Sequence, residues 1–226
     1  MGNMLKKRLN RSNSPVAAMV VAAMMVFVWL AGGHSALAGT QAEEPLSASV
    51  QASLQNAISD SAVIKTVFNS IVDEQAWVFD MSSRLARKIP DATTRTEFLR
   101  TVHYEASRAG LDPQMVLGLI QVESNFRKYA MSSAGARGFM QVMPFWVKLI
   151  GRPDQNLFHL RTNLRYGCTI LRHYLDIEHG DYYRALGRYN GSLGKPEYPT
   201  LILTSWHGSW KYDRPRLASI PGNPEK

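Results

Sequence analysis

One carboxylate in this sequence stands where it could transfer protons. Glu123 falls in the last turn of an expected helix, where the backbone dipole presents its negative end. It shares the apolar face of that helix, at spacings of three, four and seven residues, with Ile120, Leu119 and Val116. Burial and the dipole both disfavour the ionised form and should raise the pKa of this group. A carboxylic acid that stays protonated near neutral pH suits general-acid cleavage of a glycosidic bond.

A second interpretation of Glu123 stays open at this point. The basic residues Arg127 and Lys128 follow it within five positions, so the carboxylate could instead lie at the rim of the fold as their ion-pair partner. Helix geometry alone favours neither interpretation.

A loop of small residues follows this helix. The stretch "SSAGARG", from Ser132 to Gly138, suits a tight backbone path close to another molecule, although a flexible turn explains the same composition. The next stretch, "GFMQVMP", brings the amide of Gln141 near the thioether of Met143. Methionine at such a spacing is usually a core residue. The glutamine is therefore the stronger candidate for contact with a ligand.

Helices are the elements expected to hold these residues. Asp112 as N-cap and Pro113 at the first helical position begin the helix that carries Glu123, which is expected to end near Asn125. No strand-like alternation of useful length and no internal repeat is visible, so the predicted fold class is all-α. Further helices are expected over Thr94–Ala109, with Gly110 at the C-cap, over Leu157–Glu178, closed by His179 and Gly180, and from the Asp181 cap through Tyr189.

The N-terminus predicts export. Four basic residues precede an uncharged apolar run from Val16 to Ala31, and "ALA" at 36–38 offers a cleavage point before Gly39. This order is typical of a secretory signal peptide, here residues 1–38, and the expected location is the periplasm or cell envelope. An uncleaved membrane anchor is the alternative, because the run is near the short limit for a span. No cysteine lies near the cleavage point, which excludes a lipoprotein anchor.

Residues 39–94 form an N-terminal extension before a domain over residues 95–226. Within it, residues 39–59 are small and polar and are expected to be a loose start to the mature chain. Residues 60–89 carry apolar positions at helical spacing, which predicts one or two helices ending before Pro90.

Composition narrows the classes of function. The chain has 226 residues with 26 Lys and Arg against 18 Asp and Glu, but removal of residues 1–38 lowers the net charge from +8 to +4. That modest surplus suits an anionic polymer, and export argues against nucleic acid as the partner. The single cysteine, Cys168, leaves no internal disulfide and is expected to be a buried, inert thiol. The sequence shows no metal-ligand grouping and no cofactor motif, so neither a metal nor a cofactor is expected.

Five ordered motifs resemble the catalytic domain of the soluble lytic transglycosylases, the goose-lysozyme-like family that acts on peptidoglycan. The resemblance extends over roughly residues 95–215, and residues 40–94 show none. The motifs are Glu123-Ser124-Asn125-Phe126, the stretch 130–138 ("AMSSAGARG"), Phe139 to Pro144, the pattern N-x-x-x-G-x-x-x-L from Asn163 to Leu171, and Tyr189-Asn190.

This resemblance implies a lysozyme-like helical domain crossed by a sugar groove, with Glu123 as its single catalytic acid and base. It also implies roles in substrate binding. Ser132 and Gln141 would contact the N-acetyl group or the region of the glutamate, and Met143 would line the cleft. Tyr189 would hydrogen-bond near the carboxylate, while Asn190 would hold the local structure of its motif. The sequence departs from the family where "GRYNGS" replaces a run of small residues around the tyrosine, and where Phe139 replaces a leucine; both changes bear on groove shape more than on chemistry.

The count of carboxylates bears on the mechanism. Glycosidases with two carboxylates need a second acid across the scissile bond, but the next acid after Glu123 is Asp154, and the facing loop has none. This favours assistance by the N-acetyl group of the substrate and closure of a 1,6-anhydro ring on N-acetylmuramic acid, unless Asp154 folds close to Glu123. The alternatives are a hydrolytic lysozyme on the same fold, or a non-catalytic wall-binding component of an envelope assembly. The expected partners are peptidoglycan glycan strands, with an envelope machine unspecified, and the expected state is a monomer.

Overall fold

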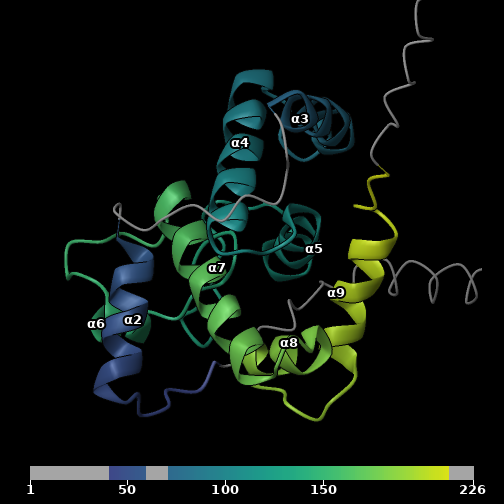
Figure 1. Cartoon of the computed structure of the whole chain (residues 1–226). Coiled ribbons are helices and arrows are strands. Elements are labelled where there is room, and N and C mark those ends of the chain that lie inside the picture. Colours follow the sequence, from purple (N-terminus) through teal and green to yellow (C-terminus); the bar gives the residue numbers. More distant parts are fainter. Residues whose placement is uncertain (1–40, 60–70, 214–226) are drawn as a thin grey trace, which may run out of the picture. The chain divides into compact units, whose positions relative to one another are not determined.

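The computed structural model of the chain describes residues 41–59 and 71–213, and the predicted signal peptide lies outside them. Within these residues the structure is all-helical, and its only β features are the isolated bridges Met131–Arg137 and Arg137–Val142 (Figure 1). The predicted all-α class is therefore confirmed for this part of the chain. The helices are α2 (Ala48–Ile58), α3 (Ile71–Leu85), α4 (Ala92–Arg108), α5 (Pro113–Ser124), α6 (Phe145–Ile150), α7 (Leu160–Ile177), α8 (Tyr182–Asn190) and α9 (Glu197–His207).

The helix that carries Glu123 begins and ends where the sequence predicts. The Asp112 side chain accepts a hydrogen bond from the Gln114 backbone N–H at 2.7 Å, and Pro113 follows at the first helical position. At the other end Asn125 adopts a left-handed conformation with φ 50°, which stops α5 directly after Glu123 and Ser124. The chain therefore leaves the helix within two residues of the carboxylate and reaches the loop of small residues at Ser132.

The other helices predicted from caps are also present. The Asp181 side chain accepts from the Arg184 backbone N–H at 3.1 Å and begins α8, and Gly110 follows α4 with φ 67°. α7 ends as predicted before His179 and Gly180, but it begins three residues late, at Leu160. The reason is local: the Asn156 side chain accepts from the Phe158 N–H at 2.9 Å, which holds residues 156–158 in a turn.

The expectation of a loose start over residues 39–59 is wrong for residues 48–58, which form α2. The Ser47 side chain caps its first turn, and Leu54 and Ile58, four residues apart, are buried against the domain. α2 packs on α6 and α7. The Gln51 amide donates to the Leu149 carbonyl of α6 at 2.6 Å, so that α2 and α6, which the sequence did not predict, stabilise each other.

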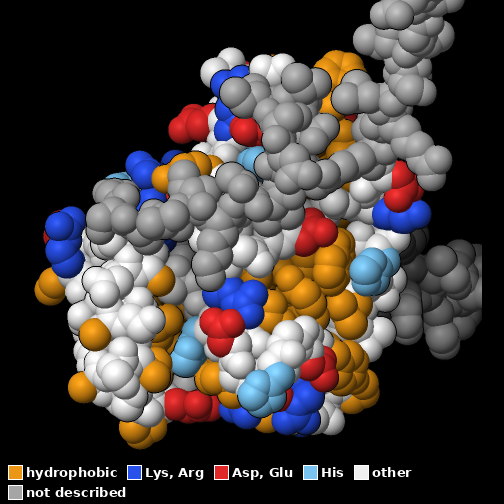
Figure 2. Space-filling model, viewed as in Figure 1, with side chains coloured by type: hydrophobic (Ala, Val, Ile, Leu, Met, Phe, Trp, Pro, Cys, Tyr) orange, Lys and Arg blue, Asp and Glu red, His pale blue; other side chains and the backbone are white. Residues whose placement is uncertain are grey.

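α5 lies in the core and packs against α4 and α9 (Figure 1). The contact with α9 is close because Gly118 has no side chain: a Cβ there would lie 3.1 Å from the backbone nitrogen of Trp206. α9 therefore runs directly over the helix that carries Glu123. Hydrophobic side chains gather beside α9 in Figure 2. One residue of α9, Leu201, is an exposed hydrophobic residue. No helix among the described residues has the length and apolar character needed to cross a bilayer.

An ion cluster joins α4 to α7 on the side of α7 that faces α2. Glu105 is buried and accepts from Arg165 at 2.9 Å, while Arg108 lies 3.7 Å away. Arg165 also donates to the Ile58 carbonyl at the C-terminus of α2. The buried Glu105 carboxylate thus positions the Arg165 guanidinium, which donates to the backbone carbonyl at the C-terminus of α2.

Candidate functional site

The structure buries Glu123 and gives it one neutral partner. The side chain of Glu123 is 5% exposed and accepts a short hydrogen bond from the hydroxyl of Tyr198, in the first turn of α9. Burial raises the pKa of Glu123 from 4.5 to about 8, and the Tyr198 hydrogen bond offsets part of that rise. At neutral pH the carboxyl group is therefore protonated and able to donate a proton.

The alternative interpretation of Glu123 as a rim ion-pair partner is wrong. Arg127 donates instead to the Ser124 carbonyl at 3.0 Å, and the Lys128 ammonium lies over the ring of Tyr129, 5.3 Å from its centroid. No neighbouring charge is among the causes of the shifted pKa of Glu123. Asp154, the next acid in the sequence, is exposed and pairs with Arg152 at 3.5 Å. In the described part of the chain, Glu123 thus has no second carboxylate beside it.

The loop after α5 is held by its own polar groups. Gln141 is a non-glycine residue at φ 49°, and its amide donates to the carbonyls of Ala130 at 3.1 Å and Gly138 at 2.9 Å. Left-handed conformations of such residues cost free energy and tend to persist where the surrounding structure imposes them, often at functional sites. Ser132 is half-buried and accepts from the Ala136 N–H at 3.1 Å, which closes the small-residue turn.

Asn163 and Gly167 on α7, both in the fourth motif, hold this loop in place. Asn163 accepts from the Met140 N–H at 2.8 Å and donates to the carbonyls of Arg137 and Leu157, both at 2.8 Å. A Cβ on Gly167 would lie 2.4 Å from the sulfur of Met140, so only glycine leaves room for that side chain. The spacing N-x-x-x-G therefore places both Asn163 and Gly167 against Met140, the residue directly before Gln141.

Tyr189 and Asn190 reach the same loop from α8. The fully buried Tyr189 donates to the Met140 carbonyl at 2.7 Å, and the charge of Glu123 is one of the groups that raise its pKa, after burial. Tyr189 is thus near the carboxylate, but its hydroxyl bonds the loop and leaves the direct contact to Tyr198. Asn190 is buried and donates to the Ser192 hydroxyl at 3.1 Å, while its own side-chain oxygen has no hydrogen-bond partner among the described residues.

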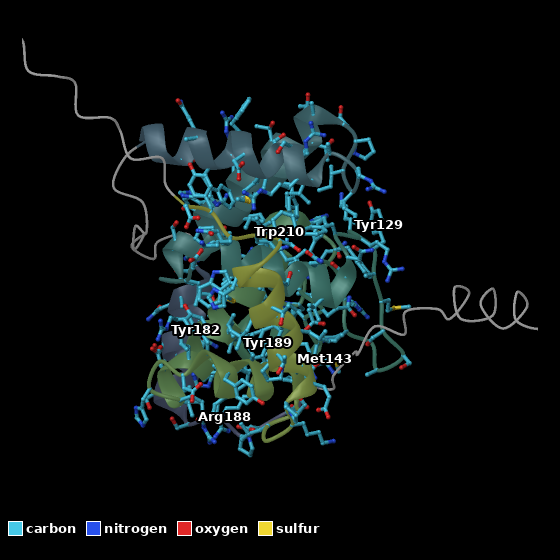
Figure 3. The ribbon with its side chains drawn as sticks, turned by 90° about the vertical axis from the view of Figure 1, so that its right-hand side faces the viewer. Tyr129, Met143, Tyr182, Arg188, Tyr189 and Trp210 are labelled. Carbon is cyan, nitrogen blue, oxygen red and sulfur yellow. The ribbon has the colours of Figure 1, made fainter. Side chains whose placement is uncertain are left out.

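The N-terminal segment contributes a residue that the sequence did not predict. Gln41 is 5% exposed, and its side-chain oxygen accepts from the indole N–H of Trp146 at 3.0 Å and from the Met143 backbone N–H at 3.3 Å. Gln41 is also among the groups that lower the pKa of Tyr189, so it lies next to that hydroxyl. In Figure 3 Met143 and Tyr189 lie near the middle of the view, where α9 crosses, and Tyr129 lies off to one side.

The structure brings most of the predicted site residues together. Tyr189 lies near Glu123 and bonds the carbonyl of Met140, the residue before Gln141, and Met143 lies near Tyr189 in Figure 3. Ser132 shapes the same loop. A separate cavity of about 780 Å³ lies along α4 and contains none of the predicted site residues. Tyr198 and Gln41 are the residues that sequence reasoning missed, since neither lies in a motif and each reaches the site from a distant part of the chain.

Comparisons with known proteins find transglycosylases. Residues 100–197 match the family described as the Transglycosylase SLT domain. The chain is 31% identical over 102 residues to a transglycosylase of Enterobacteria phage PRD1, covering 45% of this chain and 37% of that one. It is 37% identical over 84 residues to the membrane-bound lytic murein transglycosylase C of Mannheimia succiniciproducens, covering 33% and 24%. The resemblance drawn from the five motifs is confirmed, although the chain spans only about a quarter to a third of the length of these relatives.

Two solved structures are similar at lower levels. An inactive mutant of the lytic transglycosylase Slt from Pseudomonas aeruginosa superposes with a TM-score of 0.39 and 21% identity, over 59% of this chain and 25% of that one. The 70-kDa soluble lytic transglycosylase in complex with bulgecin A gives a TM-score of 0.39 and 19% identity, over 92% and 32%.

Proposed function

We propose that this chain, which carries a transglycosylase SLT domain over residues 100–197, is a peptidoglycan lytic transglycosylase that cleaves the β-1,4 bond between MurNAc and GlcNAc. The observation that carries the proposal is the state of Glu123: a carboxylic acid with a pKa of about 8, next to the loop that the family motifs define. A group with that pKa donates its proton at the pH of the envelope and recovers it within the same cycle.

The reaction uses this one group twice. Glu123 protonates the glycosidic oxygen as the bond from that oxygen to C1 of MurNAc breaks, and the acetamido oxygen of the same sugar bonds C1 from the other face. The Glu123 carboxylate then takes the proton from the C6 hydroxyl, whose oxygen attacks C1 and displaces the acetamido oxygen. The proton balance closes on Glu123, no water is consumed, and the product carries a 1,6-anhydro ring. Intramolecular attack gains from proximity.

The surrounding residues support the charge changes on Glu123. The Tyr198 hydroxyl stabilises the carboxylate that forms after proton transfer, since a hydrogen bond to the charged form favours it. Gln141 and Ser132 set the backbone of the facing loop, and we assign to that loop the contacts with the N-acetyl group. Tyr189 anchors the loop to α8 and Met143 lines the cleft, while the buried Asn190 holds the local structure of its motif through its bond to Ser192.

Location and processing follow from the N-terminus and from the relatives. We propose that residues 1–38 are removed on export, that residues 39–94 form an extension, and that residues 95–226 act on the wall in the periplasm. The relatives named membrane-bound lytic murein transglycosylases are consistent with an envelope location. N-terminal sequencing of the exported protein tests the first point: a start at Gly39 is expected, and a start at Met1 would support an anchor.

Product analysis tests the activity. The full-length chain, purified in detergent, is incubated with insoluble peptidoglycan beside its Glu123→Gln variant, and the soluble fragments are analysed by mass spectrometry. Anhydro-MurNAc ends, lower in mass than reducing ends by one water, are expected from the parent alone. Reducing ends would make the enzyme a hydrolase, and equal release of anhydro ends by the variant would refute the role of Glu123.

A further inference from the structure

Gln41 is buried at the candidate site, whereas the residues that follow it directly are not. The side chain is buried, yet the following residues 42–45 are all exposed. The next residue that packs against the core is Leu46, and Ser47 then caps α2. Among residues 41–45, Gln41 is therefore the one that is buried.

The partners of Gln41 belong to the site proposed for the glycan strand. Its side-chain oxygen accepts from the backbone N–H of Met143 and from the indole N–H of Trp146, and its side chain is among the groups that lower the pKa of Tyr189. Met143 is assigned above to the cleft, and Tyr189 holds the loop that lines it. Trp146 is 2% exposed, and its indole N–H needs an acceptor while it is covered.

The chemistry of this contact matches one group of an N-acetylated sugar. The carboxamide of glutamine presents a planar carbonyl oxygen and an N–H, and the acetamido group on C2 of GlcNAc or MurNAc presents the same pair. A carbonyl oxygen from the substrate would satisfy the two N–H donors that Gln41 now satisfies. Since one position holds one acceptor, the two amides exclude each other.

We propose that Gln41 occupies a subsite for an acetamido group of the glycan strand, so that residues 41–45 act as an intramolecular competitor of the substrate. This inference rests on the proposed function. Displacement of Gln41 leaves α2 in place, because α2 is fixed separately by Leu54, Ile58 and the hydrogen bond from Gln51 to the Leu149 carbonyl. The segment can thus leave the groove without unfolding the domain.

Competition lowers the apparent affinity for glycan by the fraction of molecules in which the subsite is open. If the hydrogen bonds of Gln41 hold it in place most of the time, its removal should tighten binding by about two- to tenfold, the range that corresponds to one net hydrogen bond. A purely structural role for Gln41 predicts a lower melting temperature and no gain in affinity.

The matched control is Gln51. Gln51 is also a glutamine of the N-terminal extension, and its amide donates to the carbonyl of Leu149 on α6. It makes no hydrogen bond to Met143, Trp146 or Tyr189. Gln41→Ala and Gln51→Ala are compared with the parent in full-length protein carrying Glu123→Gln, which prevents turnover. The probe is tetra-N-acetylchitotetraose, and its binding is measured by calorimetry beside thermal melts.

The expected result is tighter binding of the probe by Gln41→Ala and parental binding by Gln51→Ala. Unchanged or weaker binding by Gln41→Ala, with the parent binding normally, would refute the inference and leave the proposed function standing. If none of the proteins binds the probe and active protein releases no wall fragments, the proposed function falls and the inference falls with it.

A second measurement follows the segment directly. Glu43 is exposed, and Cys168 is buried with its pKa raised well above the usual value by burial, so a thiol dye would label only Glu43→Cys. Adding the probe sugar to this variant should lower the fluorescence anisotropy of the dye, as the segment leaves the groove. The combined variant with Gln41→Ala should start at the low value and stay there. Unchanged anisotropy under saturating sugar would refute displacement.

Discussion

The Glu123→Gln substitution should stabilise the protein while it abolishes catalysis, and the gain should depend on pH. In the folded protein burial raises the pKa of Glu123 to about 8, whereas the unfolded chain returns it to its ordinary 4.5. Below pH 4.5 both states are protonated, so the carboxyl group does not affect stability. Between pH 4.5 and 8 the unfolded state releases the proton and the folded state keeps it, so the parent loses stability as pH rises.

The size of this effect follows from the two pKa values. One pKa unit corresponds to about 1.4 kcal/mol, so the buried carboxyl group lowers the free energy of unfolding by about 3 kcal/mol at pH 7 and about 5 kcal/mol above pH 8. Glutamine has the same shape, still accepts from Tyr198, and does not ionise. For a domain of this size, 3 kcal/mol corresponds to roughly 6–12 °C in melting temperature. Turnover should fall by at least about 10²–10⁴-fold, since one group supplies both proton transfers.

The assay is a series of thermal melts of parent and variant from pH 4 to pH 9, beside turnover at each pH. The difference in melting temperature should be near zero at pH 4.5, grow steadily, and level off above pH 8. The exposed Glu97 serves as a matched control, and Glu97→Gln should show no such trend. A variant less stable than the parent at pH 7, or a difference that does not change with pH, would refute a buried, protonated Glu123.

Three further substitutions test the site and its support. Tyr198→Phe removes the hydrogen bond that lowers the pKa of Glu123, so the alkaline limb of the kcat profile should move up by about one to two pH units, and a limb that stays in place would contradict this. Gly138→Ala should lower the free energy of unfolding by about 2–4 kcal/mol in denaturant titrations, because φ is 75° and the new Cβ would lie 2.4 Å from the Asn163 amide. Glu105→Gln should lower the free energy of unfolding by about 1.5–3 kcal/mol in the same titrations, because it removes the buried carboxylate that pairs with Arg165 and Arg108, and a parental midpoint would refute that pairing.

The helices that could be predicted are those whose ends are encoded locally. Asp112 with Pro113, and Asp181 before α8, each place a side-chain acceptor within three residues of the N–H that it caps. α2, α6 and α9 have weaker signals: α6 and α9 each follow a proline with no side-chain cap, and α2 has the Ser47 cap but only scattered large apolar residues among small and polar ones. Their stability comes from packing, which depends on residues far away in the sequence. That dependence explains why residues 48–58 were expected to be a loose segment.

The two departures from the family motifs show how packing accommodates changes beside the site. Phe139, where the family has leucine, is buried with its ring 5.0 Å from that of Phe98, which in turn lies 6.0 Å from Phe126. A larger side chain thus joins a buried aromatic cluster. Arg188, where the family has a small residue, pairs with Glu178 at the C-terminus of α7, which turns its charge away from Tyr189.

Sequence patterns selected Glu123 as the candidate proton-transfer group but not the residues that set its pKa. Glu123 could be found because an apolar stripe, a helix end and a family motif coincide within a few residues. Tyr198 bonds it across 75 positions, and Gln41 reaches Trp146 across 105, so no local spacing connects either residue to the site. Both contacts depend on how close packing brings α9 and residues 41–47 to the loop, and the closeness of α9 depends in turn on Gly118. The chemistry of the site is thus encoded locally, whereas its pKa and its accessibility are properties of the assembled fold.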